Sequence, residues 1–361
     1  MFSPFFSVFA QIYKKYYIMS NKKSQQKISM NKKYIKKSNY CLFLTKINSK
    51  IVQKANSKEK YKWIVDKTND IVYIEITLIC ANLQNNKKED FMKLGYMTNG
   101  FGPLVGDGGG VTSVKDIRYL TLCDDEAVLK KITEIGFRYI EVLEGNLTKY
   151  AADIQVLKDM LARYNAGMMS VCVGANFIYK DALEDEMYHM KAVATLAEQV
   201  GVSYVAFCGG AIRGKGIQEE DYQLLAEGLA EASKAFADHG IEASYHPHLG
   251  SMAESPEQID KLFERTDIKI CPDLAHLAAG GGDPLEIVKK YYDRISFVHL
   301  KDLNQDGFAP LGTGTIDLEA ILAFLKEQGY CGDYLVEVDG YAGDPVEACA
   351  TSYEYLKGKL I

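Results

Sequence analysis

The sequence predicts a (β/α)₈ barrel, or TIM barrel, and three observations support this fold class. Short runs rich in Val, Ile and aromatic residues alternate with helical patterns, as in a parallel sheet covered by helices. Eight such runs follow residue 91. The 270 residues from 92 to 361 are close to the ~250 residues of a single barrel. A doubly wound sheet is the alternative, because counting strands does not show whether the sheet closes.

The eight expected strands are five or six residues long and end near polar or turn-forming residues. They are Leu94–Asn99, Tyr139–Leu143, Met168–Val173, Tyr204–Cys208, Glu242–His246, Lys269–Asp273, Ser296–Leu300 and Leu335–Asp339.

Seven helices are expected between the strands. Their apolar residues are spaced by three and four, and several end at a glycine, as at Gly136, Gly201, Gly240 and Gly329. The expected helices are Asp124–Ile135, Asp153–Tyr164, Met187–Val200, Asp221–His239, Pro256–Phe263, Pro284–Tyr291 and Asp317–Gln328.

The first 91 residues differ in composition from the rest. Residues 1–90 hold 18 Lys, no Arg and 6 acidic residues, a net charge of +12, whereas the remainder carries 24 basic and 42 acidic residues. No helical or strand period is sustained there. A basic arm for nucleic acid or acidic lipid is one interpretation. We favour a poorly structured extension outside the functional domain, which would then comprise residues 92–361.

The overall composition is that of a soluble globular protein, with 47% hydrophobic residues and a formal net charge of −6. The eight cysteines are scattered without a C-x-x-C pair, which favours reduced thiols in a cytoplasmic enzyme. The apolar stretch Ile71–Leu83 contains Glu75 and is too short to cross a bilayer. We therefore expect a cytoplasmic protein without a membrane segment.

Metal-competent side chains follow the last four expected strands. In parallel sheets, functional residues gather at the carboxyl ends of the strands. Imidazoles and carboxylates that meet there would form a nitrogen- and oxygen-rich site for a divalent ion. The candidates are His246, His248, Asp273, His299 and Glu337. The two histidines on helices, His189 and His239, are expected to be surface or helix-end residues.

Alternation along a strand pairs these candidates with further polar residues. His246 shares a side with His248, His299 with Lys301, and Glu337 with Asp339. One member of each pair can bind a metal while the other orients it or handles a proton.

Several of these residues also have a plainer interpretation. A surface ion pair of Lys301 with Asp302 is the alternative to a catalytic role for Lys301, and we expect Asp339 to cap a loop. His276 lies near Asp273, ahead of a flexible glycine-rich loop.

Three other residues are candidates for substrate binding. Glu141 is flanked by apolar residues at the end of the second strand, where an unpaired carboxylate is costly. It would bind a sugar hydroxyl, support a metal ligand or pair with a buried partner. Arg213 and Lys215 could contact an anionic substrate. The glycine-rich segments 106–110, 209–216 and 312–314 follow no dinucleotide or P-loop pattern, so nucleotide binding is not expected.

Several motifs in residues 92–361 occur in the order typical of one family. They are Asp273-x-x-His276 with Gly282-Asp283-Pro284, Val298-His299-Leu300-Lys301-Asp302, Leu311-Gly312-Thr313-Gly314-Thr315-Ile316-Asp317, and Gly329-Tyr330-x-Gly332 leading to Val336-Glu337. Together they resemble the xylose isomerase-like superfamily of sugar isomerases, epimerases and dehydratases. The resemblance implies one divalent ion, with Mn²⁺ expected first and Mg²⁺ or Co²⁺ as alternatives. Its ligands would be Asp273, His299, Glu337 and a residue of the fifth strand.

The fifth strand departs from the usual family pattern. Isomerases and epimerases of the family usually carry a Glu there, whereas this chain has His246-Pro247-His248. This motif is more similar to the inosose dehydratase branch and to the α subunits of C-glycoside deglycosylating enzymes. His246 is our first choice as fourth ligand and His248 as base, although the two roles are open to exchange.

We therefore predict a divalent-metal-dependent carbon lyase. It would act on a keto-sugar, a keto-cyclitol or a 3-keto C-glycoside, abstracting an α-proton and eliminating water or an aglycone. His248, His246, Lys301 and His276 are the predicted catalytic residues. A sugar isomerase or epimerase that uses the same metal site through an enediolate is the alternative.

Two further classes of protein are alternatives to a lyase or an isomerase. A metal-dependent endonuclease is disfavoured, because binding of a phosphate backbone needs Lys and Arg and the predicted barrel is acidic. A non-catalytic sugar-binding barrel, or a subunit that needs a partner or forms a homo-oligomer, is compatible with the sequence. We expect a small carbohydrate substrate and no nucleic-acid or membrane partner.

Overall fold

The computed structural model describes residues 64–65, 72–73, 92–107 and 118–361. The expectations for the N-terminal extension, and for residues 108–110 of the first glycine-rich segment, lie largely outside this range. The chain divides into two units, Met1–Glu89 and Asp90–Ile361. In the first unit the described residues form an antiparallel pair of two short strands, β1 (Ile64–Val65) and β2 (Val72–Tyr73).

Eight parallel strands form one sheet in the second unit, in the order β10-β9-β8-β7-β6-β3-β14-β11. The two outer strands are joined by parallel bridges between Ile270 and Ile295 and between Asp273 and His299, which closes the sheet. The predicted (β/α)₈ barrel is therefore confirmed, and the doubly wound sheet is wrong. The strands are β3 (Leu94–Met97), β6 (Tyr139–Leu143), β7 (Gly167–Gly174), β8 (Tyr204–Cys208), β9 (Glu242–His246), β10 (Lys269–Ile270), β11 (Val298–Leu300) and β14 (Tyr334–Val336).

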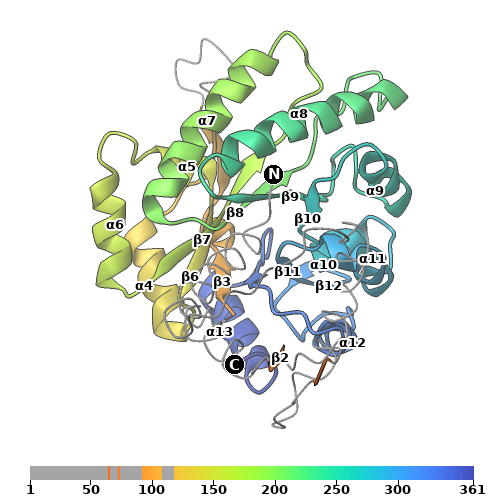
Figure 1. Cartoon of the computed structure of the whole chain (residues 1–361). Helices are drawn as coiled ribbons and strands as arrows, with labels where there is room; N and C mark the ends of the chain where they lie inside the picture. Colours follow the sequence, from red (N-terminus) through yellow and green to blue (C-terminus); the bar gives the residue numbers. More distant parts are fainter. Residues whose placement is uncertain (1–63, 66–71, 74–91, 108–117) are drawn as a thin grey trace, which may run out of the picture. The chain divides into compact units, whose positions relative to one another are not determined.

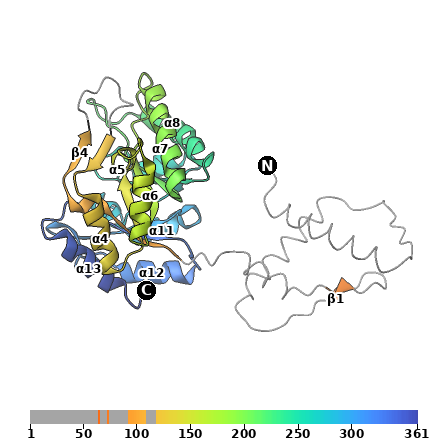
Figure 2. The same ribbon diagram turned by 90° about the vertical axis from the view of Figure 1, so that its left-hand side faces the viewer.

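Helices surround the strands (Figure 1), and Figure 2 shows α6 and α7 next to each other on the outside of the barrel. Aspartate side chains cap the first turns of six helices, where they accept hydrogen bonds from backbone N–H groups that have no partner within the helix. The α-helices of the barrel are α4 (Asp125–Ile135), α5 (Glu144–Thr148), α6 (Ile154–Arg163), α7 (Leu183–Val200), α8 (Glu219–Ala237), α9 (Pro256–Phe263), α10 (Leu274–Ala279), α11 (Pro284–Lys290), α12 (Leu318–Glu327) and α13 (Pro345–Leu356); two 3₁₀ turns, η1 (Thr98–Phe101) and η3 (Tyr292–Arg294), accompany them.

Two antiparallel hairpins extend the loops at the carboxyl ends of the strands. The first pairs β4 (Leu104–Asp107) with β5 (Arg118–Thr121) after the first barrel strand. The second pairs β12 (Asp302–Asn304) with β13 (Gly307–Ala309) directly after β11. Both therefore lie at the end of the barrel where functional residues were expected.

The barrel interior contains a separate apolar cluster, to which strands all round the barrel contribute. Its members are Met97, Leu143, Met169, Cys172, Ala206, Cys271, Phe297 and Leu335.

One pair of cysteines corrects the expectation of reduced thiols. Cys172 on β7 and Cys208 on β8 form a disulfide, with Cα atoms 6.5 Å apart. In the register of the two strands Cys172 lies opposite Ala206, so Cys208 is its diagonal neighbour on the same face. A separation of 36 residues hides this proximity in the sequence. The other cysteines of the barrel unit, Cys123, Cys271, Cys331 and Cys349, are free.

None of the helices in the described ranges combines the length and the hydropathy that a membrane-crossing segment requires.

Candidate metal centre

Four buried side chains converge at the carboxyl ends of neighbouring strands. His246 is the last residue of β9, Asp273 follows β10, His299 lies in β11 and Glu337 directly follows β14. Each offers one nitrogen or oxygen atom, and these atoms all lie within 4.8 Å of one another. Each of the four residues is at most 2% exposed. The structure thus brings together the four residues predicted to bind the metal.

Several polar atoms in this group have no hydrogen-bond partner. They include Nδ1 of His246, Oδ2 of Asp273, Nε2 of His299 and both carboxylate oxygens of Glu141. A buried polar atom without a partner costs free energy, so a cluster of them fits a ligand that supplies the missing interaction. Two imidazoles and two or three carboxylates form a suitable donor set for a divalent ion.

Two of the four residues carry charges that suit a cation, whereas Cys271 and Glu141, against the effect of burial, raise the pKa of His299 well above its ordinary value, so His299 must lose a proton to bind one. Burial holds the pKa of His246 well below its ordinary value, so its ring is neutral and offers a lone pair. Burial alone would raise the pKa of Glu337, but the Lys301 ammonium and the His299 ring keep that pKa well below its ordinary value. Burial raises the pKa of Asp273. Ionised Glu337 and neutral His246 are therefore ready to coordinate a cation.

Lys301 is fully buried beside this group, so the interpretation of a surface ion pair with Asp302 is wrong. Its ammonium lies 2.6 Å from Oδ1 of Asp339, 3.2 Å from Oε1 of Glu337 and 2.9 Å from Nε2 of His276. Burial opposes the charged form, yet the carboxylates of Asp273, Glu337 and Asp339 raise the pKa of Lys301. Lys301 is thus a fixed positive charge at the barrel mouth, and Asp339 pairs with it instead of capping a loop.

Asp302, the neighbour of Lys301, holds the following loop in place through backbone hydrogen bonds. Its carboxylate accepts hydrogen bonds from the backbone N–H groups of Leu303, Gly312, Gly314 and Ile316. The side chain is 1% exposed. The glycine-rich segment that resembled the family motif is therefore folded around a buried carboxylate.

His248 and His276 lie beside the converging group, with ring centroids 5.9 Å and 5.7 Å from that of His246. Nδ1 of His248 lies 2.8 Å from the carbonyl oxygen of Leu249, so this nitrogen carries a proton, and the lone pair of the neutral ring form is on Nε2. The two rings are 4.0 Å apart between centroids. The backbone N–H of His276 donates to Oδ1 of Asp273, which positions that carboxylate.

The residues predicted to bind substrate lie in different surroundings. Glu141 is fully buried, and its Oε1 lies 3.4 Å from Nε2 of His299, so it contacts one of the four converging residues. Arg213 pairs with Asp221 at 2.7 Å and donates to the carbonyl oxygen of Ile178. Lys215 is exposed. These two cations are not among the converging residues, and their binding of substrate stays a prediction.

Two residues differ from what the sequence suggested. Asn99 was not selected, although its Nδ2 donates to Oε1 of Glu337 at 2.8 Å. Its position at the end of the first strand could have indicated it. His189, expected at the surface, is 7% exposed because its face of α7 packs inward. His239 was predicted correctly, since it follows α8 and lies 2.7 Å from a carboxylate oxygen of Glu198.

The chain belongs to the xylose isomerase-like TIM barrel family, which matches residues 129–359. An inosose dehydratase of Clostridium botulinum is 30% identical over 270 residues, which cover 65% of this chain and 89% of that protein. The probable 3-DHS dehydratase AsbF from Bacillus anthracis superimposes with a TM-score of 0.60 at 14% identity, over 74% of this chain and 99% of AsbF. The IOLI protein, whose structure contains a zinc atom, superimposes with a TM-score of 0.57 at 19% identity, over 74% and 98%.

These findings confirm the resemblance seen in the sequence and identify the chain as an enzyme. The two structural matches, at these identities, speak for the fold alone.

Proposed function

We propose that this protein is a divalent-metal-dependent lyase that dehydrates a keto-cyclitol or keto-sugar. The observation that carries the proposal is the group of four buried ligand residues, which includes His246, together with the neighbouring His248 of the same His246-Pro247-His248 motif. The inosose dehydratase relative supports the choice of reaction. Release of an aglycone from a 3-keto C-glycoside is the same elimination with a different leaving group, and is the second substrate class we propose.

His246, Asp273, His299 and Glu337 would hold the ion, for which Mn²⁺ is our first choice. Glu141 would orient His299, and Asn99 would orient Glu337 through its hydrogen bond. An ion bound there would act as a Lewis acid on the substrate carbonyl oxygen, which is worth several kcal/mol in the transition state.

His248 is proposed as the base that removes the α-proton. Its Nδ1 is tied to the carbonyl oxygen of Leu249, which leaves the lone pair on Nε2. Its half-buried side chain is accessible to a substrate, whereas His246 is 1% exposed. Imidazole is the side chain most often used as a general base near neutral pH. We therefore assign proton transfer to His248 and metal binding to His246.

Lys301 and His276 are proposed to act on the developing charge and on the leaving group. The Lys301 ammonium is held in place by Asp339 and Glu337, so it needs no rearrangement as an enolate forms. His276 accepts a hydrogen bond from that ammonium and faces the ring of His248. It would relay or supply a proton when the β-hydroxyl leaves as water.

The first test is metal analysis of the full chain together with a dehydration assay. We expect about one Mn, Co, Fe or Zn per chain, and near-complete loss of metal in the double variant Asp273→Ala/His299→Ala. Inososes and keto-sugars should then give an unsaturated product with the metal-loaded protein alone. Unimpaired turnover by metal-free protein would overturn the proposal. An epimerised product without loss of water would favour the isomerase alternative.

A further inference from the structure

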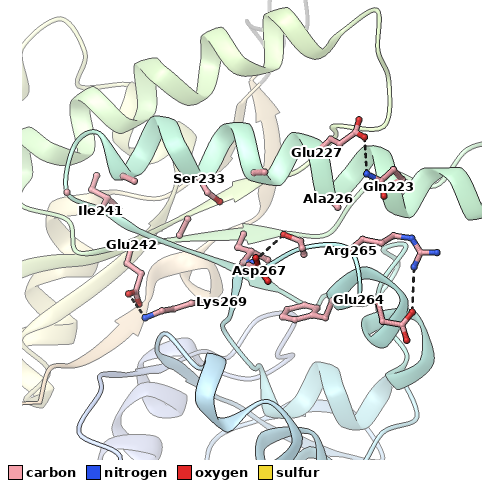
Figure 3. A pocket seen from close by; sticks show the side chains of 17 residues that line it. Gln223, Ala226, Glu227, Ser233, Ile241, Glu242, Glu264, Arg265, Asp267 and Lys269 are labelled. Atoms are coloured by element: carbon pink, nitrogen blue, oxygen red, sulfur yellow. Dashed lines mark hydrogen bonds and ion pairs between the residues drawn. The ribbon is translucent and has the colours of Figure 1, made fainter. Parts of the chain in front are cut away.

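A wide groove on the outside of the barrel does not point to a ligand. It has a volume of about 910 Å³ and lies between α8, the start of β9 and the segment 263–269 (Figure 3). Its charged side chains have partners, such as Lys269 with Glu242 and Arg265 with Glu264. Glu242 and Lys269 are the first residues of β9 and β10, so the groove lies at the end of the barrel away from the metal-competent residues.

A smaller cavity differs from this groove, because it is lined by buried polar side chains without complete hydrogen bonding. Its volume is about 180 Å³, and it lies between β5, the start of α5 and α7. A volume of ~30 Å³ per water makes it large enough for several waters or for one end of a small polar molecule. Two glutamates and one histidine line it, namely Glu144 at 2%, Glu186 at 8% and His189 at 7% exposure.

The polar atoms of this cavity are incompletely bonded. Oε1 of Glu144 accepts a hydrogen bond from the backbone of Tyr119 at 3.0 Å, but its Oε2 is buried without a partner. Nε2 of His189 is likewise buried without a partner. Among the described residues, neither Glu144 nor Glu186 forms an ion pair within 4.0 Å. Unpaired buried atoms of this kind call for a ligand that donates hydrogen bonds.

The pKa values of Glu144, Glu186 and His189 agree with a hydrogen-bonding ligand in this cavity. Burial raises the pKa of Glu144 to about 7, and burial together with Asp185 raises that of Glu186 to about 7. Burial and the nearby Arg118 lower the pKa of His189 to about 4, so its ring is neutral at neutral pH. The cavity thus offers two carboxyl groups that are about half ionised at neutral pH and one neutral imidazole.

A polyol fits this environment better than a metal ion. Glu144, Glu186 and His189 do not form a group whose ligand atoms all approach within 4.8 Å, in contrast to the metal-competent residues. Hydroxyl groups, by comparison, can donate to separate acceptors across a small cavity. Asn176, which also lines it, can both donate and accept.

The cavity lies at the same end of the barrel as the metal-competent group. Glu144 follows Glu141 by three residues, and Oε1 of Glu141 lies 3.4 Å from Nε2 of His299. Three residues of chain span at most about 10 Å. Gly174, another lining residue, is the last residue of β7, so the cavity lies at the carboxyl end of the barrel.

We infer that this cavity is a hydroxyl-binding subsite, in which Glu144, Glu186 and His189 receive the hydroxyl groups of the substrate farthest from its reacting carbonyl. The inference rests on the proposed function, because that function implies that the substrate is a polyhydroxylated ring. It assigns Glu144 and His189 to substrate specificity, and not to metal binding or proton transfer.

The test measures binding and turnover separately, with the full chain. Binding of myo-inositol, a polyol without a carbonyl group, is titrated calorimetrically for the parent, Glu144→Gln and His189→Gln. Glu184→Gln is the matched control, because Glu184 lies on α7 but is exposed. We expect the dissociation constant to rise ~10-fold or more in the two cavity variants, as one charged or buried hydrogen-bonding partner is lost, and to stay within ~2-fold in the control. Metal content should equal that of the parent in all four proteins.

The outcomes separate this inference from the proposed function. If the parent dehydrates a keto-polyol but Glu144→Gln and His189→Gln keep its KM and its myo-inositol affinity, the subsite is wrong and the function stands. If no keto-polyol is turned over but myo-inositol binds in a manner that depends on Glu144, the function is wrong and the subsite stands. A parent that does not bind myo-inositol at tens of millimolar concentration would overturn the subsite.

Discussion

The two histidines of the fifth strand have the same chemistry but different surroundings. Strand alternation places His246 and His248 on one side, and sequence alone left their roles exchangeable. In the structure His246 is buried with an unpartnered Nδ1, whereas His248 is half-buried with its Nδ1 anchored to Leu249. Burial suits a metal ligand, and an anchored, accessible ring suits a base. These contacts are the reason for assigning the two roles as we do.

Lys301 gives a prediction that separates stability from catalysis. Replacing Lys301 by Met leaves the carboxylates of Asp339 and Glu337 without their buried cation, and loss of one partner of such a pair costs about 3–5 kcal/mol of unfolding free energy. The variant should also lose at least ~100-fold in kcat, since a fixed charge facing the developing enolate is removed. Denaturant unfolding and steady-state kinetics of metal-loaded protein measure the two effects.

A second substitution serves as the control for Lys301. In Lys301→Met/Asp339→Asn one of the unpaired carboxylates is neutralised, so part of the lost stability should return while kcat stays low. Recovery of kcat together with stability would show that Lys301 acts only by holding the structure.

At the scale of elements, the sequence predicted the barrel strands well because hydrophobic runs and glycine stops are local signals. The predicted strands Tyr139–Leu143, Tyr204–Cys208 and Glu242–His246 coincide with β6, β8 and β9. The short helices α5 and α10 were missed, since five or six residues are too few to show a helical period. α13 was also missed, although it is 12 residues long and begins with Asp344 and Pro345.

Local sequence signals also predicted part of the candidate site. Residues at strand ends could be found from alternation and topology, and these include all four proposed ligands. The burial of Lys301 and His189, and the pairing of Arg213 with Asp221, depend on how loops and helices fold back on the barrel. Such contacts between distant segments leave no periodic signal in a single sequence.

Gly314 gives a prediction for the loop after β11. A Cβ atom at this position would lie 2.1 Å from Oδ1 of Asp302 and 2.6 Å from the carbonyl oxygen of Leu303. Gly314→Ala should therefore displace the buried carboxylate and lower the unfolding free energy by about 1–3 kcal/mol. Gly214→Ala is the control, because Gly214 has no neighbour within 4 Å and lies in an exposed loop. Equal stability of the two variants would contradict the packing described for Asp302.

At the scale of the whole molecule, the proposed metal ligands lie across the seam of the barrel. The sheet closes between β10 and β11 through only two isolated bridges, one of which joins Asp273 to His299. Both of these residues are proposed ligands, and the other two come from the adjoining strands β9 and β14. An ion held by all four would therefore link four strands around the weakest junction of the sheet.

Removal of the metal should accordingly loosen this seam more than the rest of the barrel. At a free metal concentration 100 times the dissociation constant, binding contributes about 2.7 kcal/mol, which corresponds to a rise in Tm of roughly 5–10 °C. Chelation should reverse that rise in the parent and leave the Tm of Asp273→Ala/His299→Ala unchanged. Hydrogen exchange should speed up at the amides of Ser296 and His299, which bond across the seam to Ile270 and Pro272, while the amides between β7 and β8 stay protected. Equal acceleration of exchange at the seam and between β7 and β8 would mean that the ion stabilises the whole barrel. No change in exchange at either place would contradict the binding of the ion at the seam.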